Sequence, residues 1–578
     1  MKRSAALTRR LPALLLILML LCSCGTSPAP ESADGLYQPG EYQLTTFDKM
    51  EYRRPDTAAL EALFTATADF ADRASSGDRR ALTDQLERCW DAYDEYCTME
   101  TLAMLRSDMD QGDEYWAEEY SFCWENGVLL EQWMDRLLVA CASSSAKLPS
   151  RLLAGYDEGD AEPYSDRAVE LMERENALLQ EYWQAMQLDE IQLNGQTVSY
   201  LDTISDPLIS DADYAAAQAA YCRSCNDAAA PLYAELIRTR RALAAEFGFD
   251  SYEEFQYASY GRDYTPAQVG VYLDDVAARF APYYRSFMAS DPFSRVSYDT
   301  LSPPRLLSLL EKATADLGDS VTDAFARLKQ YRLYSVTSSA RKAPGAYTVY
   351  LNSYGAPFCY LGAYGDVEDF LDLAHEFGHF ADACVNYNAT GNLDLAETYS
   401  QAMANLALLR GREALGDRGF RNLLLLHLLS NLGLYAEQGA YADFESRAYA
   451  LSDDELTVEN LNALALSCAR RFGADVTDPD TADLSWVQVN HLFEQPFYVV
   501  SYCVSADAAI QIAEREMEDP GAGAACYEDL LDWQEDAFLS ELERVGLESP
   551  FAPGRAEHNM ALVETLLEND LGDLLNAA

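Results

Sequence analysis

Two histidines and a glutamate stand close together in the segment His375-Glu376-Phe377-Gly378-His379. On a helix, residues four apart lie about 40° apart around the axis, so both imidazoles face one side and can bind the same zinc ion. Glu376 projects beside them and can act as general base toward a zinc-activated water. We predict that His375 and His379 are ligands of one Zn²⁺ per chain and that Glu376 is catalytic.

A third protein ligand is expected on the following helix, because a catalytic zinc keeps only its fourth position for water. This helix is expected to begin near Leu393, and it offers Asp394 and Glu397. Asp394 is better explained as an N-cap, whereas Glu397 lies in an apolar run and needs a positive partner. We predict Glu397 as the third ligand; a glutamate on a solvated face is the alternative. Ser400, one turn later, could orient the Glu397 carboxylate.

Peptide-bond hydrolysis also needs a hydrogen-bond donor for the developing oxyanion, and such a donor is worth about 10²–10³ in rate. One short segment supplies a histidine and two tyrosines, namely His491, Tyr498 and Tyr502. Taken alone this signal is weak, because aromatic stripes are commonly part of a hydrophobic core. Of the five histidines in the chain, His427 is predicted to be a satisfied core or interface residue and His558 to be exposed.

Helices and one pair of strands are predicted to position these residues. From Pro55 to about Met288 the apolar spacing is overwhelmingly helical, and there is no fixed-period repeat. Two short segments, 346–352 and 357–362, are rich in aromatic and β-branched residues and are predicted to be strands. The helix that carries the two histidines follows at once, with Gly365-Asp366 as its predicted turn and N-cap.

The first 23 residues are predicted to be the signal peptide of a lipoprotein. Four basic residues precede an apolar core of eleven residues, 11–21, which is too short to span a bilayer. The sequence Leu21-Cys22-Ser23-Cys24 resembles a bacterial lipobox with Cys24 as the lipidated residue; ordinary secretion is the alternative. We therefore expect an extracytoplasmic protein, lipid-anchored to the bacterial cell membrane through Cys24 only.

The composition excludes some classes of partner. With 95 Asp and Glu against 42 Lys and Arg the formal net charge is −53, which disfavours nucleic acid because phosphate binding requires clustered cations. Apolar residues make up 49% of the chain and aromatic residues 11%, so the charge belongs to a folded body and not to a disordered acidic tail. We expect a monomer without a nucleic-acid partner.

Several segments in succession resemble the oligoendopeptidase F branch of the thimet-oligopeptidase-like zinc metallopeptidases. HExxH by itself is shared by many metallopeptidases, but the succession of segments is specific. The segments that carry the likeness are 52–56, 238–276, 365–379, 395–401, 435–445, 455–461 and 497–509. The distance from the first histidine to Glu397 is shorter than is usual in this branch.

The resemblance implies a mainly α, two-lobed helical zincin with a deep central channel and a small β-sheet beside the zinc helix. It implies the same three zinc ligands and general base, with His491 and Tyr502 as transition-state donors and Tyr498 nearby. The spacing to the tyrosines is shifted, so the choice between them stays open. It also implies that one strand is a substrate-binding edge that pairs with the peptide backbone. This strand holds Pro357, Phe358, Cys359, Tyr360 and Leu361.

Four regions are predicted: a signal peptide (1–23), a lipidated cysteine with a flexible tether (24–50), an N-terminal helical lobe (51–200) and a catalytic zinc peptidase region (201–578). The predicted function is hydrolysis of internal bonds of short unfolded peptides by a lipid-anchored zinc metallopeptidase. One alternative is a dipeptidyl carboxypeptidase or carboxypeptidase of the same structural group. A peptide-binding lipoprotein without activity is a further, less favoured alternative.

Overall fold

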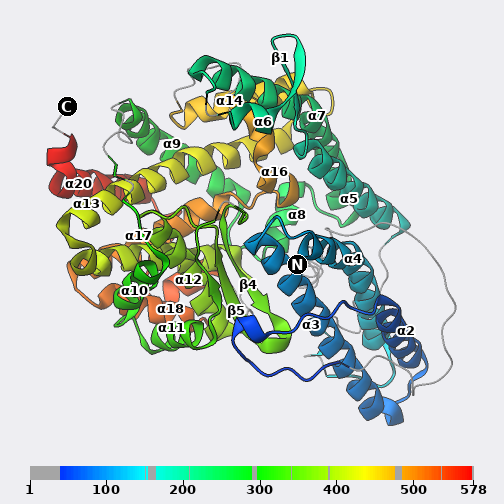
Figure 1. Cartoon of the computed structure of the whole chain (residues 1–578). Coiled ribbons are helices and arrows are strands. Elements are labelled where there is room, and N and C mark those ends of the chain that lie inside the picture. Colours follow the sequence, from blue (N-terminus) through cyan, green and yellow to red (C-terminus); the bar gives the residue numbers. More distant parts are fainter. Residues whose placement is uncertain are drawn as a thin grey trace.

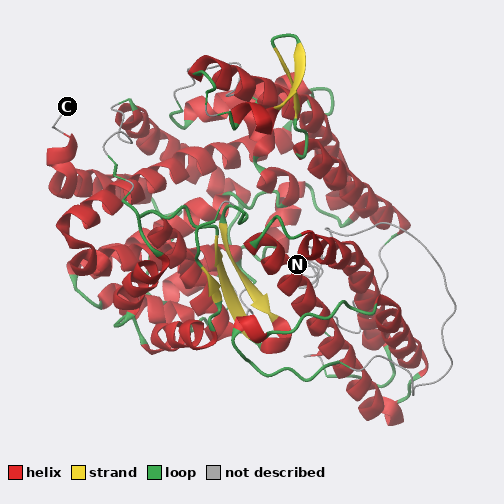
Figure 2. Cartoon of the chain, viewed as in Figure 1, coloured by secondary structure: helices red, strands yellow, loops and turns green. Residues whose placement is uncertain are grey.

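The computed structural model describes ten stretches of the chain. They are residues 39–149, 152–153, 165–206, 208–289, 296–297, 299–339, 341–387, 391–474, 484–535 and 537–575. The predicted signal peptide, Cys24 and most of the predicted tether lie outside the described residues. Helices make up 71% of the described residues, which also form two small sheets. Figure 2 shows how helices predominate. The predicted mainly helical class is thereby confirmed.

Three long helices open the described chain: α2 (Thr57–Arg73), α3 (Arg79–Met109) and α4 (Glu114–Ser143). Leu60, Leu63 and Phe64 lie on one face of α2 and are fully buried, as helical apolar spacing requires. They belong to a hydrophobic core that α2, α3 and α4 build among themselves. Figure 1 shows these three helices (blue) beside the main body.

The next helix, α5 (Asp166–Met186), packs against α7 (Asp211–Glu246) and belongs to the larger core. Met99, Leu102 and Leu105 in the second half of α3 also belong to this larger core, and residue 200 as a lobe boundary stays a prediction. Between α5 and α7 lies a hairpin of β1 (Glu190–Leu193) and β2 (Gln196–Ser199). Its turn is Asn194-Gly195, with φ of 53° and 77°, a pair that tolerates the left-handed region.

The other α-helices follow in the described part of the chain. They are α6 (Tyr200–Ile204), α8 (Tyr252–Ser259), α9 (Pro266–Met288), α10 (Pro303–Thr314), α11 (Asp319–Tyr331), α12 (Asp369–Asn386), α13 (Leu393–Ala450), α14 (Val458–Arg471), α16 (Asn490–Glu494), α17 (Val500–Glu518), α18 (Ala522–Leu531), α19 (Phe538–Arg544) and α20 (Arg555–Leu575). Among the described residues, no helix combines the length and the apolar character needed to cross a membrane.

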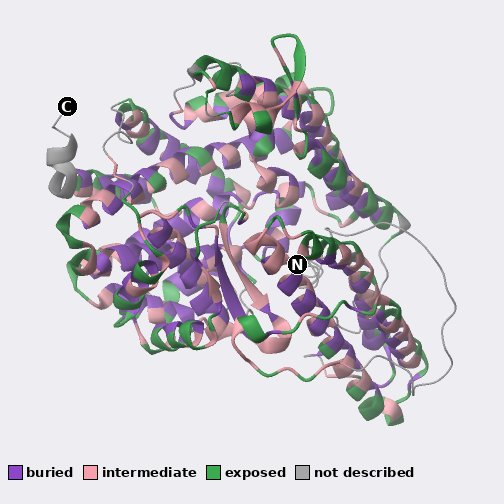
Figure 3. Cartoon of the chain, viewed as in Figure 1, coloured by how far each residue is buried: buried purple, intermediate pink, exposed green. Residues whose placement is uncertain are grey.

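The second sheet has three strands, in the order β3 (Tyr334–Ser335), β5 (Ala356–Leu361), β4 (Ala346–Leu351). β5 is antiparallel to β4 and parallel to the short β3. The two predicted strands are therefore confirmed, with boundaries shifted by about one residue. Figure 3 shows β5 buried along its whole length, while most of β4 has intermediate exposure.

The prediction that β5 is the substrate-binding edge is wrong. β5 is the central strand, and every one of its residues is buried. The residues that this corrects are Pro357, Phe358, Cys359, Tyr360 and Leu361. Their continuous apolar run is typical of a strand covered on both faces, which holds a sheet together and offers no free edge. β4 and the two-residue β3 each have a sheet neighbour on one side only, so these two are the edge strands.

Two predicted helix caps are also corrected. α12 begins at Asp369, three residues after the predicted cap Asp366. The Asp369 carboxylate accepts hydrogen bonds from the N–H groups of Tyr364 and Gly365 at 2.8 Å each. α13 begins at Leu393 as predicted, but its N-cap is Asn392, whose side chain accepts from the next backbone N–H groups. Asp394 is instead buried inside the helix, at 1% exposure.

α13 is broken at Gly416, where φ is 75° and ψ is 163°. This backbone conformation is essentially restricted to glycine, because a Cβ would clash. Beyond it the chain turns back, and Asn405 of the first arm is hydrogen-bonded to His427 of the second arm. The two arms of one continuous segment therefore line the same cavity, described below.

Candidate active site

His375 and His379 on α12 and Glu397 on α13 come together in the structure. Their candidate ligand atoms all lie within 4.8 Å of one another, and Nε2 of His375 is 3.7 Å from Oε2 of Glu397. Two imidazoles and a carboxylate on two packed helices are the donor set of many catalytic zinc sites. The residues present therefore fit a zinc ion.

The two histidines are in the protonation state that a metal needs. Burial lowers the pKa of His375 and of His379 to about 4, so both imidazoles are neutral at neutral pH. Neutral imidazole is the form that binds zinc, because a protonated ring has no free lone pair. Removing these rings from water therefore favours metal binding over protonation.

Gly378 lets the two helices approach closely. A Cβ built on Gly378 would lie 2.5 Å from the Cα of Ser400 and 2.5 Å from the carbonyl oxygen of Tyr399, both backbone atoms of α13. Backbone atoms cannot move aside like the end of a flexible side chain, so any larger residue would push α12 and α13 apart. The glycine between Glu376 and His379 thus helps to set the distance between the histidines and Glu397.

Both carboxylate oxygens of Glu397 receive hydrogen bonds. The hydroxyl of Tyr498 donates to Oε1 at 2.6 Å, and Oγ of Ser400 lies 3.3 Å from Oε2 and 3.0 Å from the Glu397 carbonyl oxygen. The position of Ser400 matches the orienting role predicted for it. Neighbours of this kind fix the orientation of a metal ligand. The geometry gives Tyr498 the same task, through its contact with Glu397.

Glu376 is buried at 5% exposure and is held by the edge strand β4. Oγ1 of Thr348 donates to Oε2 of Glu376 at 2.9 Å and is equally close to its backbone carbonyl oxygen. Burial raises the pKa of Glu376 to about 8. Sequence reasoning missed Thr348; its only signal is its place in a strand just before the HExxH helix.

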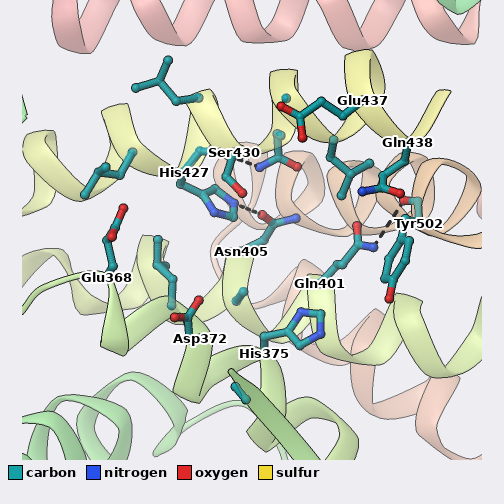
Figure 4. A pocket seen from close by; sticks show the side chains of 18 of the residues that line it. Glu368, Asp372, His375, Gln401, Asn405, His427, Ser430, Glu437, Gln438 and Tyr502 are labelled. Carbon is teal, nitrogen blue, oxygen red and sulfur yellow. Dashed lines mark hydrogen bonds between the residues drawn. The ribbon is translucent and has the colours of Figure 1, made fainter. Parts of the chain in front are cut away.

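A cavity of about 620 Å³ opens beside these residues, and Figure 4 shows part of its lining. Among the predicted site residues, His375, Glu376, His491 and Tyr502 line it, whereas Tyr498 does not. The hydroxyl of Tyr502 lies 3.4 Å from Nε2 of His491. Burial raises the pKa of Tyr502 and lowers that of His491, so the tyrosine keeps its proton and can donate it in a hydrogen bond. The two tyrosines therefore have different positions: Tyr502 lines the cavity, and Tyr498 contacts Glu397.

Sequence reasoning missed most of the remaining cavity wall. The polar residues concerned are Glu368 and Asp372 at the start of α12, and Gln401, Asn405, His427, Ser430, Glu437 and Gln438 on the two arms of α13. His427 is satisfied by Asn405 as expected, yet it also lines the cavity. No short-range pattern marks these residues, because the fold at Gly416 brings the two arms together. His558 is exposed as predicted and pairs with Glu514.

Comparison with known proteins identifies the N-terminal unit first. Residues 47–148 match the family model described as the peptidase M3 N-terminal domain. This range coincides with the three-helix unit of α2, α3 and α4 and the short segment before it. No curated protein matches the chain.

The whole fold is shared with solved peptidase structures. PZ peptidase A, solved with an inhibitor, is 19% identical with a TM-score of 0.69, covering 91% of this chain and 100% of that chain. A structure described as a candidate oligoendopeptidase F has 22% identity, the same TM-score and the same coverage. Oligoendopeptidase-F from Enterococcus faecium has 15% identity and a TM-score of 0.55, covering 90% and 99%. The chain thus has the fold of the oligoendopeptidase F structures, and its residues 47–148 match the N-terminal domain of the M3 peptidases.

Proposed function

We propose that the protein is a zinc metallopeptidase that hydrolyses internal bonds of short unfolded peptides. The observation that carries this proposal is the convergence of His375, His379 and Glu397, of which His375 lines the cavity. The same cavity is lined by Glu376 as a base and by the pair His491 and Tyr502 as donors. The oligoendopeptidase F-like fold of the M3 family supports this assignment.

Each of these residues has a separate role in the proposed reaction. His375, His379 and Glu397 would hold the zinc, which when bound polarises the scissile carbonyl and makes the attacking water more acidic. Glu376, whose ionised form a bound zinc would favour, takes the proton of that water and passes it to the leaving amine. Tyr502, beside His491, donates a hydrogen bond to the oxyanion that develops on the carbonyl oxygen. Tyr498 and Ser400 keep the Glu397 carboxylate oriented.

The sheet suggests how a peptide would be held. Since β5 is central, the two edges of the sheet are β3 and β4. β4 is the edge at the site, because its Ala346 lines the cavity and its Thr348 contacts Glu376. We propose that the peptide backbone adds as a strand to β4, with its scissile bond beside Glu376. Main-chain pairing of this kind would accept many sequences and would exclude folded proteins, whose backbone is already paired.

The substitution Glu376→Gln tests this mechanism. It keeps the shape of the side chain and its contact with Thr348 but removes the base. Hydrolysis of a mixed peptide pool, read by mass spectrometry, is expected to stop while one zinc per chain stays bound. Turnover at the wild-type rate in this variant would overturn the mechanism. Peptide binding without any product from the wild type would favour a non-catalytic peptide-binding lipoprotein.

Endopeptidase and exopeptidase activity can be separated by blocking the substrate. A peptide with an amidated C-terminus is expected to be cut as well as its free-acid form, because an endopeptidase makes no required contact with the terminal carboxylate. Loss of cleavage on amidation would instead indicate a dipeptidyl carboxypeptidase or carboxypeptidase. The positions of the cuts in the free-acid form provide a second, independent answer.

The lipid anchor and the extracytoplasmic location are also proposed. They rest on the basic residues, the short apolar core and the lipobox-like sequence that ends at Cys24. Metabolic labelling with a radioactive fatty acid should label the wild-type chain and not the Cys24→Ser variant. Labelling of both, or release of the wild type into the medium, would contradict the anchor.

A further inference from the structure

The segment that carries the two tyrosines contains a strained residue. Phe497, between α16 and α17, has a φ of 63°. A bulky residue is rarely found in the left-handed region, which favours glycine, because its Cβ crowds the backbone. Such conformations persist only where the surrounding structure imposes them, and they cluster at functional sites. Tyr498, which contacts Glu397, is the very next residue.

Buried ionisable side chains hold both backbone groups of Phe497. Its N–H donates to Oε1 of Glu445 at 2.8 Å, and its carbonyl oxygen accepts from Nη2 of Arg262 at 2.8 Å. Glu445 is 0% exposed, and the side chain of Arg262 is 1% exposed. Glu445 lies on the second arm of α13 and Arg262 follows α8, so the two groups reach Phe497 from different elements.

Three further contacts fix the same segment. Nη2 of Arg262 also donates to Oγ of Ser501 at 2.8 Å, and the hydroxyl of Tyr260 donates to the carbonyl oxygen of Pro496 at 3.1 Å. Arg240, fully buried on α7, donates to the carbonyl oxygen of Phe493. The backbone is therefore held from just after His491 to just before Tyr502. Hydrogen bonds to charged donors are the stronger kind.

Arg262 also reaches the helix that carries the third candidate zinc ligand. Its Nε lies 3.8 Å from Oδ2 of Asp394, which also accepts from the hydroxyl of Tyr264 at 2.8 Å. Asp394 stands one turn before Glu397 on α13. One buried arginine thus connects the tyrosine segment with the metal-binding helix.

This arrangement is costly for stability. Among the described residues, Oδ1 of Asp394, Oε2 of Glu445 and two nitrogens of Arg262 have no hydrogen-bond partner. A buried polar group without a partner destabilises the folded state, because it has lost its hydrogen bonds to water. A core that served stability alone would be better built from apolar residues. The cost is explained if the buried groups hold the segment in a geometry that it would not adopt by itself.

We propose that Glu445, Arg262 and Tyr260 are positioning residues of the reaction: they hold the segment 496–501 so that Tyr502 faces the cavity and Tyr498 contacts Glu397. The proposal rests on the proposed function, because it assigns these two tyrosines to transition-state and metal-ligand contacts. None of the three residues needs to touch the substrate. Their removal should therefore lower kcat far more than it changes KM.

The first test compares Glu445→Leu with Glu445→Gln. Leu removes the acceptor for the Phe497 N–H, and a displacement of about 1 Å at the reacting groups can cost about 10²-fold in rate. We expect kcat to fall by about 10–10²-fold, with KM within about threefold and bound zinc unchanged. Gln keeps the acceptor. Burial raises the pKa of Glu445 to about 8, so Gln resembles its neutral form, and kcat should return to within about threefold of the wild type.

A matched control separates positioning from stability. Glu516, at the other end of α17, is 8% exposed, pairs with Arg410 and accepts from the N–H groups of Gly521 and Ala524. The Glu516 carboxylate therefore holds backbone N–H groups of another loop, as the Glu445 carboxylate holds the N–H of Phe497. Glu516→Leu should lower the melting temperature as Glu445→Leu does, yet leave kcat within about twofold of the wild type.

Tyr260→Phe is a second variant that keeps the fold, since it removes only one hydroxyl. It should lower kcat by about 3–10-fold through loss of the bond to Pro496. Tyr96→Phe, which removes a buried hydroxyl that donates to a carbonyl oxygen of α4, should leave kcat unchanged. Equal kcat in the wild type and Tyr260→Phe, or no difference between Leu and Gln at position 445, would overturn the inference. A wild type that cleaves no peptide would overturn the proposed function first.

Discussion

The two walls of the cavity are built in different ways. On one wall, His375 lines the cavity from a regular helix, and its alignment with His379 follows from a spacing of four residues. On the other wall, His491 and Tyr502 come from two helices joined by an irregular segment. That segment is held by side chains far away in the sequence; Arg240 and Phe493, for example, are 253 residues apart. The first wall depends mainly on local structure and the second on tertiary contacts.

This difference decides how each wall responds to substitution. On the helical wall a single change removes a ligand or alters the distance between two helices, so zinc binding should respond first. On the other wall a change should leave zinc in place and act on the rate, except at Tyr498, whose hydroxyl contacts Glu397. Measuring zinc content and kcat together therefore separates the two walls.

The largest effect is expected for Glu397→Ala. Zinc content should fall from one per chain to near zero, and activity by about 10³-fold or more, because the metal supplies several kcal/mol of transition-state stabilisation. Glu413→Ala, at an exposed position of the same helix, is the control and should change neither quantity. Full zinc occupancy in Glu397→Ala would show that this glutamate is no ligand.

The pair Tyr502→Phe and Tyr498→Phe tests the division between the tyrosines. Loss of the Tyr502 hydroxyl should lower kcat by about 10²–10³-fold with zinc retained, as for the loss of an oxyanion donor. Loss of the Tyr498 hydroxyl should weaken zinc binding by about 10–100-fold, because Glu397 loses a hydrogen bond that orients it. Competition with a chelator measures zinc affinity. The reverse pattern would exchange the two roles.

Gly378→Ala tests the close approach of α12 and α13. The added methyl meets backbone atoms of Tyr399 and Ser400, so the helices must separate, at a cost of about 1–3 kcal/mol in stability. Zinc affinity should also fall, because the separation of the helices changes the distance between the histidines and Glu397. The control is Gly270→Ala on α9, where a Cβ meets nothing within 4 Å and stability should rise by about 0.5–1 kcal/mol. Unchanged zinc affinity in Gly378→Ala would show that this packing does not set the ligand distance.

The smallest effect is expected for Thr348→Val. The substitution keeps the shape of the side chain but removes its hydrogen bond to Oε2 of Glu376, so kcat should fall by about 3–10-fold without loss of zinc. Thr67→Val on α2 is the matched control, because its hydroxyl donates to a carbonyl oxygen of its own helix. If both variants behave alike, the contact between β4 and Glu376 has no part in the rate.

The helical wall could be predicted from sequence because its information is local. The HExxH spacing, the acid in an apolar helix and the serine one turn later all lie within 26 residues, and the structure brings these residues together. The position of β5 in its sheet was predicted wrongly, because an apolar run indicates a strand but does not tell a central strand from an edge strand.

The other wall could be predicted only in part. His491 and Tyr502 were found among aromatic residues, but the choice between Tyr498 and Tyr502 depends on which hydroxyl reaches Glu397, a contact across 101 residues. His427 was predicted to be a core residue because its neighbours in sequence are leucines. Only the chain reversal at Gly416 brings it to the cavity. Contacts of this kind depend on tertiary structure and have no short-range signal.

A zinc titration of the metal-free chain tests the central claim most directly. The purified protein is stripped with a chelator and zinc is added back in small steps, while bound zinc and cleavage of an internally quenched peptide are measured in the same samples. We predict that activity is absent at the start, rises in proportion to bound zinc and reaches its maximum at one zinc per chain. Full activity in the stripped protein, or one bound zinc without cleavage, would contradict the account.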